Sequence, residues 1–105
     1  MTSKERMIAA LNHQEADRVP RGENAFDYTF YQEVMGRKTL CYGGWDELEA
    51  LWSGNRDKVV ADYIDSLVAF TKKMRWDYIR VPAAPKKKDY SGYKRIEDHA
   101  FVDNR

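Results

Sequence analysis

The chain has 105 residues, of which 33% are charged and 43% hydrophobic, a composition that indicates one globular domain and excludes a disordered or fibrous protein. Its 18 lysines and arginines oppose 17 aspartates and glutamates, and a net charge of +1 gives no long-range field to recruit nucleic acid or an anionic membrane, so neither is expected as a partner. The single cysteine, Cys41, excludes an internal disulfide, and no apolar stretch has the length of a signal-peptide core or a membrane span, so we expect a cytoplasmic protein.

A helix is predicted over residues 3–13, followed by a polar elbow and the start of a strand. Thr2 is placed to cap the helix, and Glu5 lies three residues later, where it can reach back to the Thr2 backbone. Apolar residues then repeat at helical spacing. After the elbow, Pro20 biases Val19 towards extended geometry, so we expect a short buried strand to begin there.

Three more helices are predicted before the second strand. Residues 26–35 place apolar side chains on one face, and Gly36 is suited to end that helix in a left-handed conformation. The apolar face consists of Phe26, Phe30, Val34 and Met35. A short helix over residues 45–52 lies between two glycine-containing breaks. The longest helix runs from Asn55, a favourable N-cap, to about Met74, because its apolar residues keep helical spacing almost without a break.

An alternating pattern predicts a second strand over residues 76–81, and Pro82 interferes with its continuation. Residues 82–88 are predicted to form a loop, and residues 93–104 a β-hairpin with its turn at positions 98–99. A strand, several helices and a second strand follow the order of a right-handed βαβ unit. The fold class is therefore expected to be α/β.

Two parallel strands cannot cover their own edges and faces. A parallel sheet is normally covered by helices on both faces and by further strands at its edges, and the predicted elements do not supply them. We therefore expect the chain to be part of a larger barrel, to pair with another chain, or to fold differently. Bare apolar faces favour self-association, so a homo-oligomer or a complementing barrel chain is the expected partner.

Three motifs follow one another along this order of elements. They are Lys4-Glu5-Arg6 with Ala10-Leu11 in the first helix, Asp17-Arg18-Val19-Pro20 at the elbow, and WDYIRVP after the long helix. This pattern resembles the N-terminal segment of the uroporphyrinogen decarboxylase superfamily over nearly the whole chain. The resemblance implies the N-terminal portion of a (β/α)8 TIM barrel, roughly its first third, helix-rich and with a C-terminal β-hairpin. A chain of this kind is expected to be inactive alone.

The residues after the first strand distinguish branches of that superfamily. Its true decarboxylases carry an R-Q-A-G-R-Y segment there, whose arginines bind substrate carboxylates, whereas this chain has RGENAF at positions 21–26. The resemblance therefore implies the cobalamin-dependent methyltransferase or O-demethylase branch, which acts with a corrinoid protein. That branch binds zinc through a His-x-Cys pair and a later cysteine in the C-terminal half of the barrel. No cofactor is accordingly expected in this chain, while corrinoid and zinc belong to the complete family member.

Arg21, Glu23 and Asn24 are the candidate substrate-binding residues, because such barrels bind ligands at the carboxyl ends of their strands. Arg21 could pair with an anionic group, and Glu23 could accept a hydrogen bond or act as a general base if burial raised its pKa. The alternative is a solvated loop or a cap for the following helix. The alternative function is a non-catalytic module that oligomerises through its bare βαβ faces and serves in binding or assembly.

Three further groups of residues favour structural roles. His13, Cys41 and His99 have separations that match no zinc pattern, so no metal site is expected. Lysines 86–88 are typical of a solvated loop tip rather than of a nucleic-acid contact. Six aromatic residues could line a pocket for a flat ligand, although such residues more often form a core or an interface. They are Tyr28, Tyr31, Trp45, Trp52, Tyr63 and Trp76.

Overall fold

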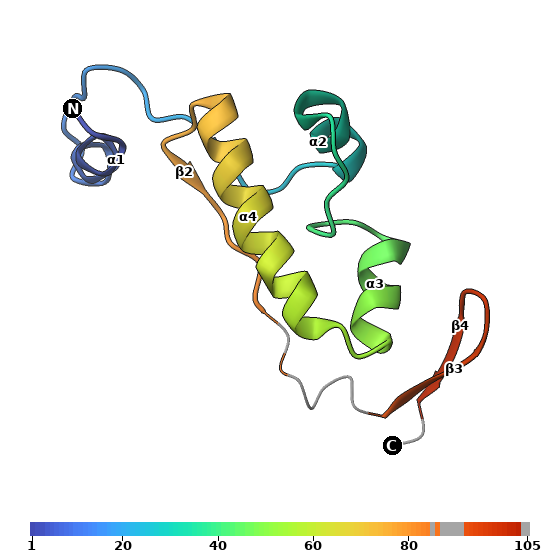
Figure 1. The fold of residues 1–105 in the computed structure, drawn as a ribbon. Coiled ribbons are helices and arrows are strands. Elements are labelled where there is room, and N and C mark those ends of the chain that lie inside the picture. The colour runs from blue at the N-terminus through green and yellow to red at the C-terminus, as the bar shows by residue number, and fades with distance from the viewer. Residues whose placement is uncertain (85, 87–91, 104–105) are drawn as a thin grey trace.

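The computed structural model describes residues 1–84, 86 and 92–103 of the chain. The helices are α1 (Ser3–Leu11), α2 (Tyr28–Met35), α3 (Trp45–Trp52) and α4 (Arg56–Met74), and the strands are β1 (Gly22–Glu23), β2 (Tyr78–Ile79), β3 (Tyr93–Glu97) and β4 (Ala100–Asp103). Figure 1 shows α1 and the β3–β4 hairpin at opposite ends of an elongated molecule, with α4 between them. Within the described ranges, no helix has the length and apolar character needed to cross a membrane.

The first helix begins as predicted and ends two residues early. Thr2 and Glu5 form the predicted capping box, in which Thr2 N–H donates to Glu5 Oε2 at 2.7 Å and Glu5 N–H donates to Thr2 Oγ1 at 3.2 Å. The helix stops at Leu11 because His13 adopts a left-handed φ of 56°, which cannot continue a right-handed helix.

The first strand lies three residues later than predicted. It was expected to begin at Val19 as a buried strand, but Val19 is 81% exposed and β1 consists of Gly22 and Glu23. β1 and β2 pair in parallel, in a register that places Gly22 opposite Tyr78. Gly22 permits this close approach, since a Cβ there would lie 2.4 Å from the Tyr78 carbonyl oxygen. The position of β1 is thus decided by its contact with β2 and not by the effect of Pro20 on the residue before it.

The predicted end of the second helix is confirmed, whereas its predicted apolar face is confirmed only in part. It starts two residues after the predicted start, because Asp27 caps it by accepting a hydrogen bond from Thr29 N–H at 2.8 Å. Gly36 ends the helix with a left-handed φ of 69°, as predicted. The inward position is taken by Tyr31, which is fully buried, whereas Phe30 is largely exposed.

The remaining elements follow the predicted order. α3 has its predicted bounds, and Asn55 precedes α4 as predicted, although its side chain makes no capping hydrogen bond. β2 covers only two residues of the predicted 76–81, and the hairpin has its turn at residues 98–99 as expected. The chain is therefore a mixed α/β structure with one βαβ unit. The described strands form two separate two-stranded sheets and no barrel.

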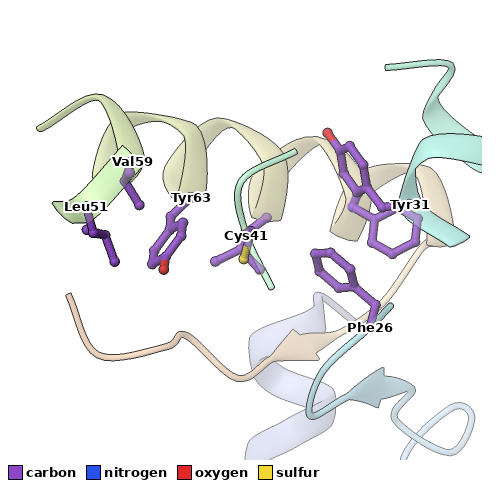
Figure 2. Packing of buried hydrophobic residues seen from close by; sticks show 8 residues of the cluster. Phe26, Tyr31, Cys41, Leu51, Val59 and Tyr63 are labelled. Atoms are coloured by element: carbon purple, nitrogen blue, oxygen red, sulfur yellow. The ribbon is translucent and has the colours of Figure 1, made fainter. Parts of the chain in front are cut away.

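The core lies between α4 and the elements that connect β1 to it. Figure 2 shows its labelled side chains spread along α4, from Leu51 at one end to Tyr31 at the other. Phe70 is fully buried and its ring contacts those of Phe26 and Tyr31, with centroid separations of 4.7 and 5.1 Å. The remaining members of this core are Cys41, Val59, Tyr63 and Leu67.

A small polar network fixes the segment after α2 to α4. Thr39 Oγ1 donates to Asp62 Oδ2 at 2.9 Å, and Leu40 N–H donates to the same oxygen at 2.7 Å. Ser66 Oγ, fully buried, lies 2.8 Å from Thr39 Oγ1. Cys41 N–H donates to Thr39 Oγ1 at 3.0 Å, so this network also holds Cys41 in the core and positions the adjacent Tyr42.

Candidate functional site

The carboxyl ends of the parallel strands β1 and β2 form the candidate site. Asn24 follows β1 and Arg80 follows β2, and Arg80 N–H donates to the Glu23 carbonyl oxygen at 3.3 Å. Tyr42 comes from the segment between α2 and α3, and its Oη donates to the Asn24 carbonyl oxygen at 3.4 Å. Three segments that are distant in sequence therefore meet at one edge of the sheet.

Burial and neighbouring charges shift the pKa values of Tyr42 and Glu47. Burial raises the pKa of Tyr42 above its usual value; Cys41 and Glu47 add to that rise, and Arg80 opposes it. Glu47 lies in the first turn of α3, and burial raises its pKa although a backbone hydrogen bond with Gly43 acts in the opposite direction. Tyr42 therefore lies within electrostatic range of both Glu47 and Arg80.

The side chains of Arg80, Glu47 and Tyr42 offer three kinds of chemistry. A guanidinium such as that of Arg80 binds an anionic group. A carboxyl group with a raised pKa, such as that of Glu47, can hold or transfer a proton closer to neutral pH than an exposed glutamate can. The Tyr42 hydroxyl can donate a hydrogen bond. The set is suited to binding a polar or anionic ligand and to exchanging a proton with it.

The three residues predicted from the sequence lie around the same strand but not at the same end. Arg21 precedes β1, and its backbone N–H donates to Asp77 Oδ2 at 2.9 Å. Glu23 is the last residue of β1 and Asn24 follows it. All three are exposed. The expectation that all of them follow the strand is thus wrong for Arg21, which precedes β1, and for Glu23, which belongs to it, because the strand begins later than the proline signal indicated.

Sequence reasoning missed Tyr42, Glu47 and Arg80. Arg80 did carry a signal, since it is a charged residue near the carboxyl end of the predicted strand over residues 76–81, and barrel ligand sites lie at that end. Glu47 reads in the sequence as an ordinary acidic residue in the first turn of a helix. Only the packing of α3 against the rest of the fold shows that it is half-buried.

The amino ends of β1 and β2 hold an ion network around Asp77. Arg6 Nη1 donates to Asp77 Oδ1 at 2.5 Å, and Arg18 Nη1 donates to Asp77 Oδ2 at 2.6 Å. Arg6 also binds Asp17 in a bidentate manner, from Nε at 2.6 Å and from Nη2 at 2.9 Å. The Asp77 side chain has no exposed surface, so its charge depends on these partners. The network fastens α1 to the start of both strands.

The pKa values of the two carboxylates in this network reflect their hydrogen bonds. The Arg21 backbone N–H and the Arg18 guanidinium, in that order, hold the pKa of Asp77 well below its usual range, and Arg6 contributes further. The Arg6 guanidinium lowers the pKa of Asp17 to about 2. Both groups are therefore carboxylates at neutral pH, and they serve as structural anchors for α1.

His13, Cys41 and His99, which the sequence offered as possible metal ligands, lie in separate parts of the fold. The described residues contain no group of three or more histidine, cysteine, aspartate or glutamate side chains that could hold a metal ion. His13 lies just beyond α1 and Cys41 is buried in the core, while His99 on the hairpin accepts a hydrogen bond from Trp45 Nε1. Of the predicted lysine run, residues 87–88 lie outside the described residues.

The six aromatic residues considered for a pocket belong to separate places in the fold. Two of them are in the buried core, namely Tyr31 and Tyr63. Trp76 packs on Phe70 with ring centroids 5.3 Å apart. Trp45 and Trp52 contact each other on α3, and Trp52 stacks on Tyr93 of the hairpin at 5.2 Å. The tryptophans of α3 therefore attach the hairpin to the body of the protein.

An open apolar groove of about 580 Å³ runs between α4 and the segment that begins with β2. Its lining residues come from α4, from Ile79 of β2 and from the residues that follow β2. Ile64 and Val68 of α4 line it and are 63% and 49% exposed, and Val81 on the opposite wall is 70% exposed. The groove is thus an exposed apolar surface of the described chain.

No family model, curated protein or solved structure matches the chain. Its function is accordingly inferred from two features of the molecule. One is the parallel β1–β2 pair with its open groove, and the other is the set of polar side chains at the carboxyl end of that pair.

Proposed function

We propose that this chain is the N-terminal βαβ unit of a (β/α)8 barrel of the uroporphyrinogen-decarboxylase-like type, and that it is inactive alone. The observation that supports this best is the parallel pairing of β1 with β2 through a connection that contains α4. Parallel strands joined through helices are the repeating unit of such barrels. In the described ranges each of these strands has one neighbour, so further strands and helices are needed to cover the sheet.

The residues that carry the resemblance support the proposal by where they lie. Arg6 and Arg18 belong to two of the resembling motifs, and both bind Asp77 at the point where β2 begins. Asp17, from the second motif, binds Arg6. The motifs thus have a physical role, which is to join a flanking helix to the amino ends of the first two strands. In a barrel, that end contributes stability, and the opposite end contributes chemistry.

The proposed activity of the complete barrel is corrinoid-dependent methyl transfer of the O-demethylase type, in the cytoplasm. The RGENAF segment at positions 21–26 lacks the arginine motif of true decarboxylases, which favours the methyltransferase branch. The partners are the remaining barrel units, in the same chain or in a complementing one, and a corrinoid protein. Glu23 and Asn24, together with Tyr42 and Arg80, would contribute to the substrate side of the strand ends.

The described residues do not fit a zinc site. Burial raises the pKa of the Cys41 thiol to about 12, which keeps it protonated, whereas zinc binds the thiolate. In addition, the described residues contain no group of three potential metal ligands. Both cofactors would therefore be held by the remaining barrel units, and no step of the reaction is assigned to them in this chain.

A chimeric barrel tests the proposal. Residues 1–84 would replace the corresponding N-terminal units of a corrinoid-dependent methyltransferase of this superfamily, and demethylation of an aryl methyl ether would be measured with a reduced corrinoid protein. We expect the chimera to be active and the isolated chain to be inactive. A chimera that is folded, as judged by circular dichroism, but inactive while its parent enzyme is active would contradict the proposal.

The second candidate is a non-catalytic module that oligomerises through its open faces. It is favoured by the elongated shape, since the radius of gyration is 17.4 Å, against about 13 Å for a compact domain of this length. A chain that forms a stable oligomer but never supports activity in a chimera would favour this alternative. The two candidates therefore differ in the outcome of the same experiment.

A further inference from the structure

The open groove beside α4 is mainly apolar and has one basic side chain near one end. Its described lining residues on α4 run from Val60, near the amino end of the helix, to Lys72, near the carboxyl end, a distance of about 18 Å along a helix. The opposite wall consists of Ile79 of β2 and of residues that follow β2. None of the described lining residues is acidic. The groove therefore combines a long apolar surface with a positive charge near one end.

A hydroxyl group without a partner lies at the same end of the groove. Thr71 precedes Lys72 and also lines the groove. Its hydroxyl oxygen is buried and has no hydrogen-bond partner among the described residues. Buried hydroxyl groups normally have such a partner, so a ligand that supplies one gains a favourable contact there. A carboxylate is suited to this place, because it accepts a hydrogen bond from a hydroxyl group and pairs with an ammonium group.

The size and the lining of the groove fit a single acyl chain. Its volume of about 580 Å³ lies within the range of about 300–1,000 Å³ that is usual for small-molecule sites. Ile64, Val68 and Val81 expose aliphatic surface in it. Burying one methylene group of a ligand against such a surface strengthens binding about fourfold. A fatty acid matches this lining, since it is apolar along its chain and charged at one end only.

We propose that the groove beside α4 binds a free long-chain fatty acid. The acyl chain lies between α4 and the segment that follows β2, and the carboxylate pairs with the Lys72 ammonium group and accepts a hydrogen bond from the Thr71 hydroxyl. The proposal goes beyond the proposed function, because Tyr42, Glu47 and Arg80 do not line this groove. The source is the free acid and not a membrane, since a net charge of +1 gives no long-range attraction to anionic lipid.

Isothermal titration calorimetry of the full chain with dodecanoate tests the proposal. We expect saturable binding with a dissociation constant of about 1–100 μM, and hexanoate, with half the chain length, to bind at least about 100-fold more weakly. Ile64→Asp should weaken dodecanoate binding at least about 100-fold, because it places a carboxylate beside the acyl chain. Leu11→Asp on α1 is the matched control, since Leu11 is also an exposed aliphatic residue but lies outside the groove. It should leave the dissociation constant unchanged. Circular dichroism establishes that each variant is folded.

A charge reversal tests the position of the carboxylate. Lys72→Glu should weaken dodecanoate binding by about 10-fold and strengthen the binding of dodecyltrimethylammonium, which has the same chain and the opposite charge, by a similar factor. Lys73→Glu is the matched control, because Lys73 also lies in the last turn of α4 but does not line the groove. It should change neither dissociation constant by more than about twofold. Thr71→Val removes the hydroxyl group and should weaken only dodecanoate binding, by about fivefold.

Several results would overturn the proposal. They are the absence of saturable dodecanoate binding, an equal loss of binding in Ile64→Asp and Leu11→Asp, and a preference for dodecanoate over dodecyltrimethylammonium that Lys72→Glu leaves unchanged. A chain that binds vesicles of dioleoyl phosphatidylglycerol but not dodecanoate would also overturn it, since the ligand would then be a membrane surface. All these measurements use the chain alone, so an inactive, folded chimera would contradict only the proposed function, and a chain without dodecanoate binding would contradict only this inference.

Discussion

Arg6 and Asp77 are 71 residues apart in the chain, and their side chains are joined at 2.5 Å between Nη1 and Oδ1. This contact connects the first helix to the residue that precedes β2. Neither side chain is more than 8% exposed. The position of α1 relative to the βαβ unit therefore depends on an ion network, in which Arg6 and Arg18 compensate the charge of Asp77.

Asp77→Asn is expected to destabilise the protein and loosen α1. The amide cannot compensate two guanidinium groups, so Arg6 and Arg18 lose their shared anionic partner. We expect the melting temperature to fall by at least about 5 °C, and the amides of α1 to exchange with solvent faster than those of α4. Asp98→Asn is the control, because the Asp98 side chain is fully exposed, and it should leave both readouts unchanged.

The same network predicts how stability depends on pH. The pKa of Asp17 is lowered from its ordinary 3.8 to about 2, and that of Asp77 is lowered as well. Because both pKa values are depressed in the folded state, the stabilisation is complete above about pH 5 and is lost as the pH falls through the folded pKa values. The melting temperature should therefore fall on acidification more steeply in the wild type than in the Asp17→Asn/Asp77→Asn variant. Parallel curves would contradict this role of the network.

Gly22→Ala is expected to disrupt the pairing of β1 with β2. A Cβ at residue 22 would lie 2.4 Å from the backbone oxygen of Tyr78, so the strands must separate. We expect a loss of about 2–3 kcal/mol or more in the free energy of unfolding, measured with urea. Gly36→Ala is the comparison, since nothing lies within 4 Å of its added Cβ and only its left-handed φ is unfavourable. It should cost about 1 kcal/mol. Equal losses would contradict the close approach of the strands.

The strands and helices could be predicted to different degrees for physical reasons. The caps at Thr2 and Gly36 and the hairpin turn depend on neighbouring residues, so local patterns identified them. The start of β1 was missed because it is set by contact with Tyr78, far along the chain. The inward residue of α2 is likewise decided by distant contacts, since the Tyr31 ring packs against both Phe26 and Phe70.

The candidate site was predictable only in part. Glu23 and Asn24 were found because they come after the expected start of a strand, and Arg80 could have been found as a charged residue near the carboxyl end of the second expected strand. Glu47 and Tyr42 could not, because their shifted pKa values arise from burial that only the folded chain shows. The ion pair of Arg6 with Asp77 could not be predicted either, since no local sequence pattern relates two residues that are so far apart in the chain.

Cys41 is expected to be unreactive in the folded protein. It is fully buried, and burial raises its pKa to about 12, so almost no thiolate forms near neutral pH. We expect a colorimetric disulfide reagent to react with it at least about 100-fold more slowly under native conditions than in concentrated guanidinium chloride. Reaction at the unfolded rate in native buffer would contradict this and show that the Cys41 side chain is accessible to solvent.

The central claim is that this βαβ unit is the N-terminal part of a barrel and becomes active only together with the remaining barrel units. The most direct measurement is to titrate the full chain into the separately produced remaining units of a corrinoid-dependent methyltransferase of the same superfamily, and to follow demethylation of an aryl methyl ether. The account predicts that activity, absent from either component alone, rises and saturates at one chain per barrel remainder. No activity at any ratio, with both components folded, would contradict it.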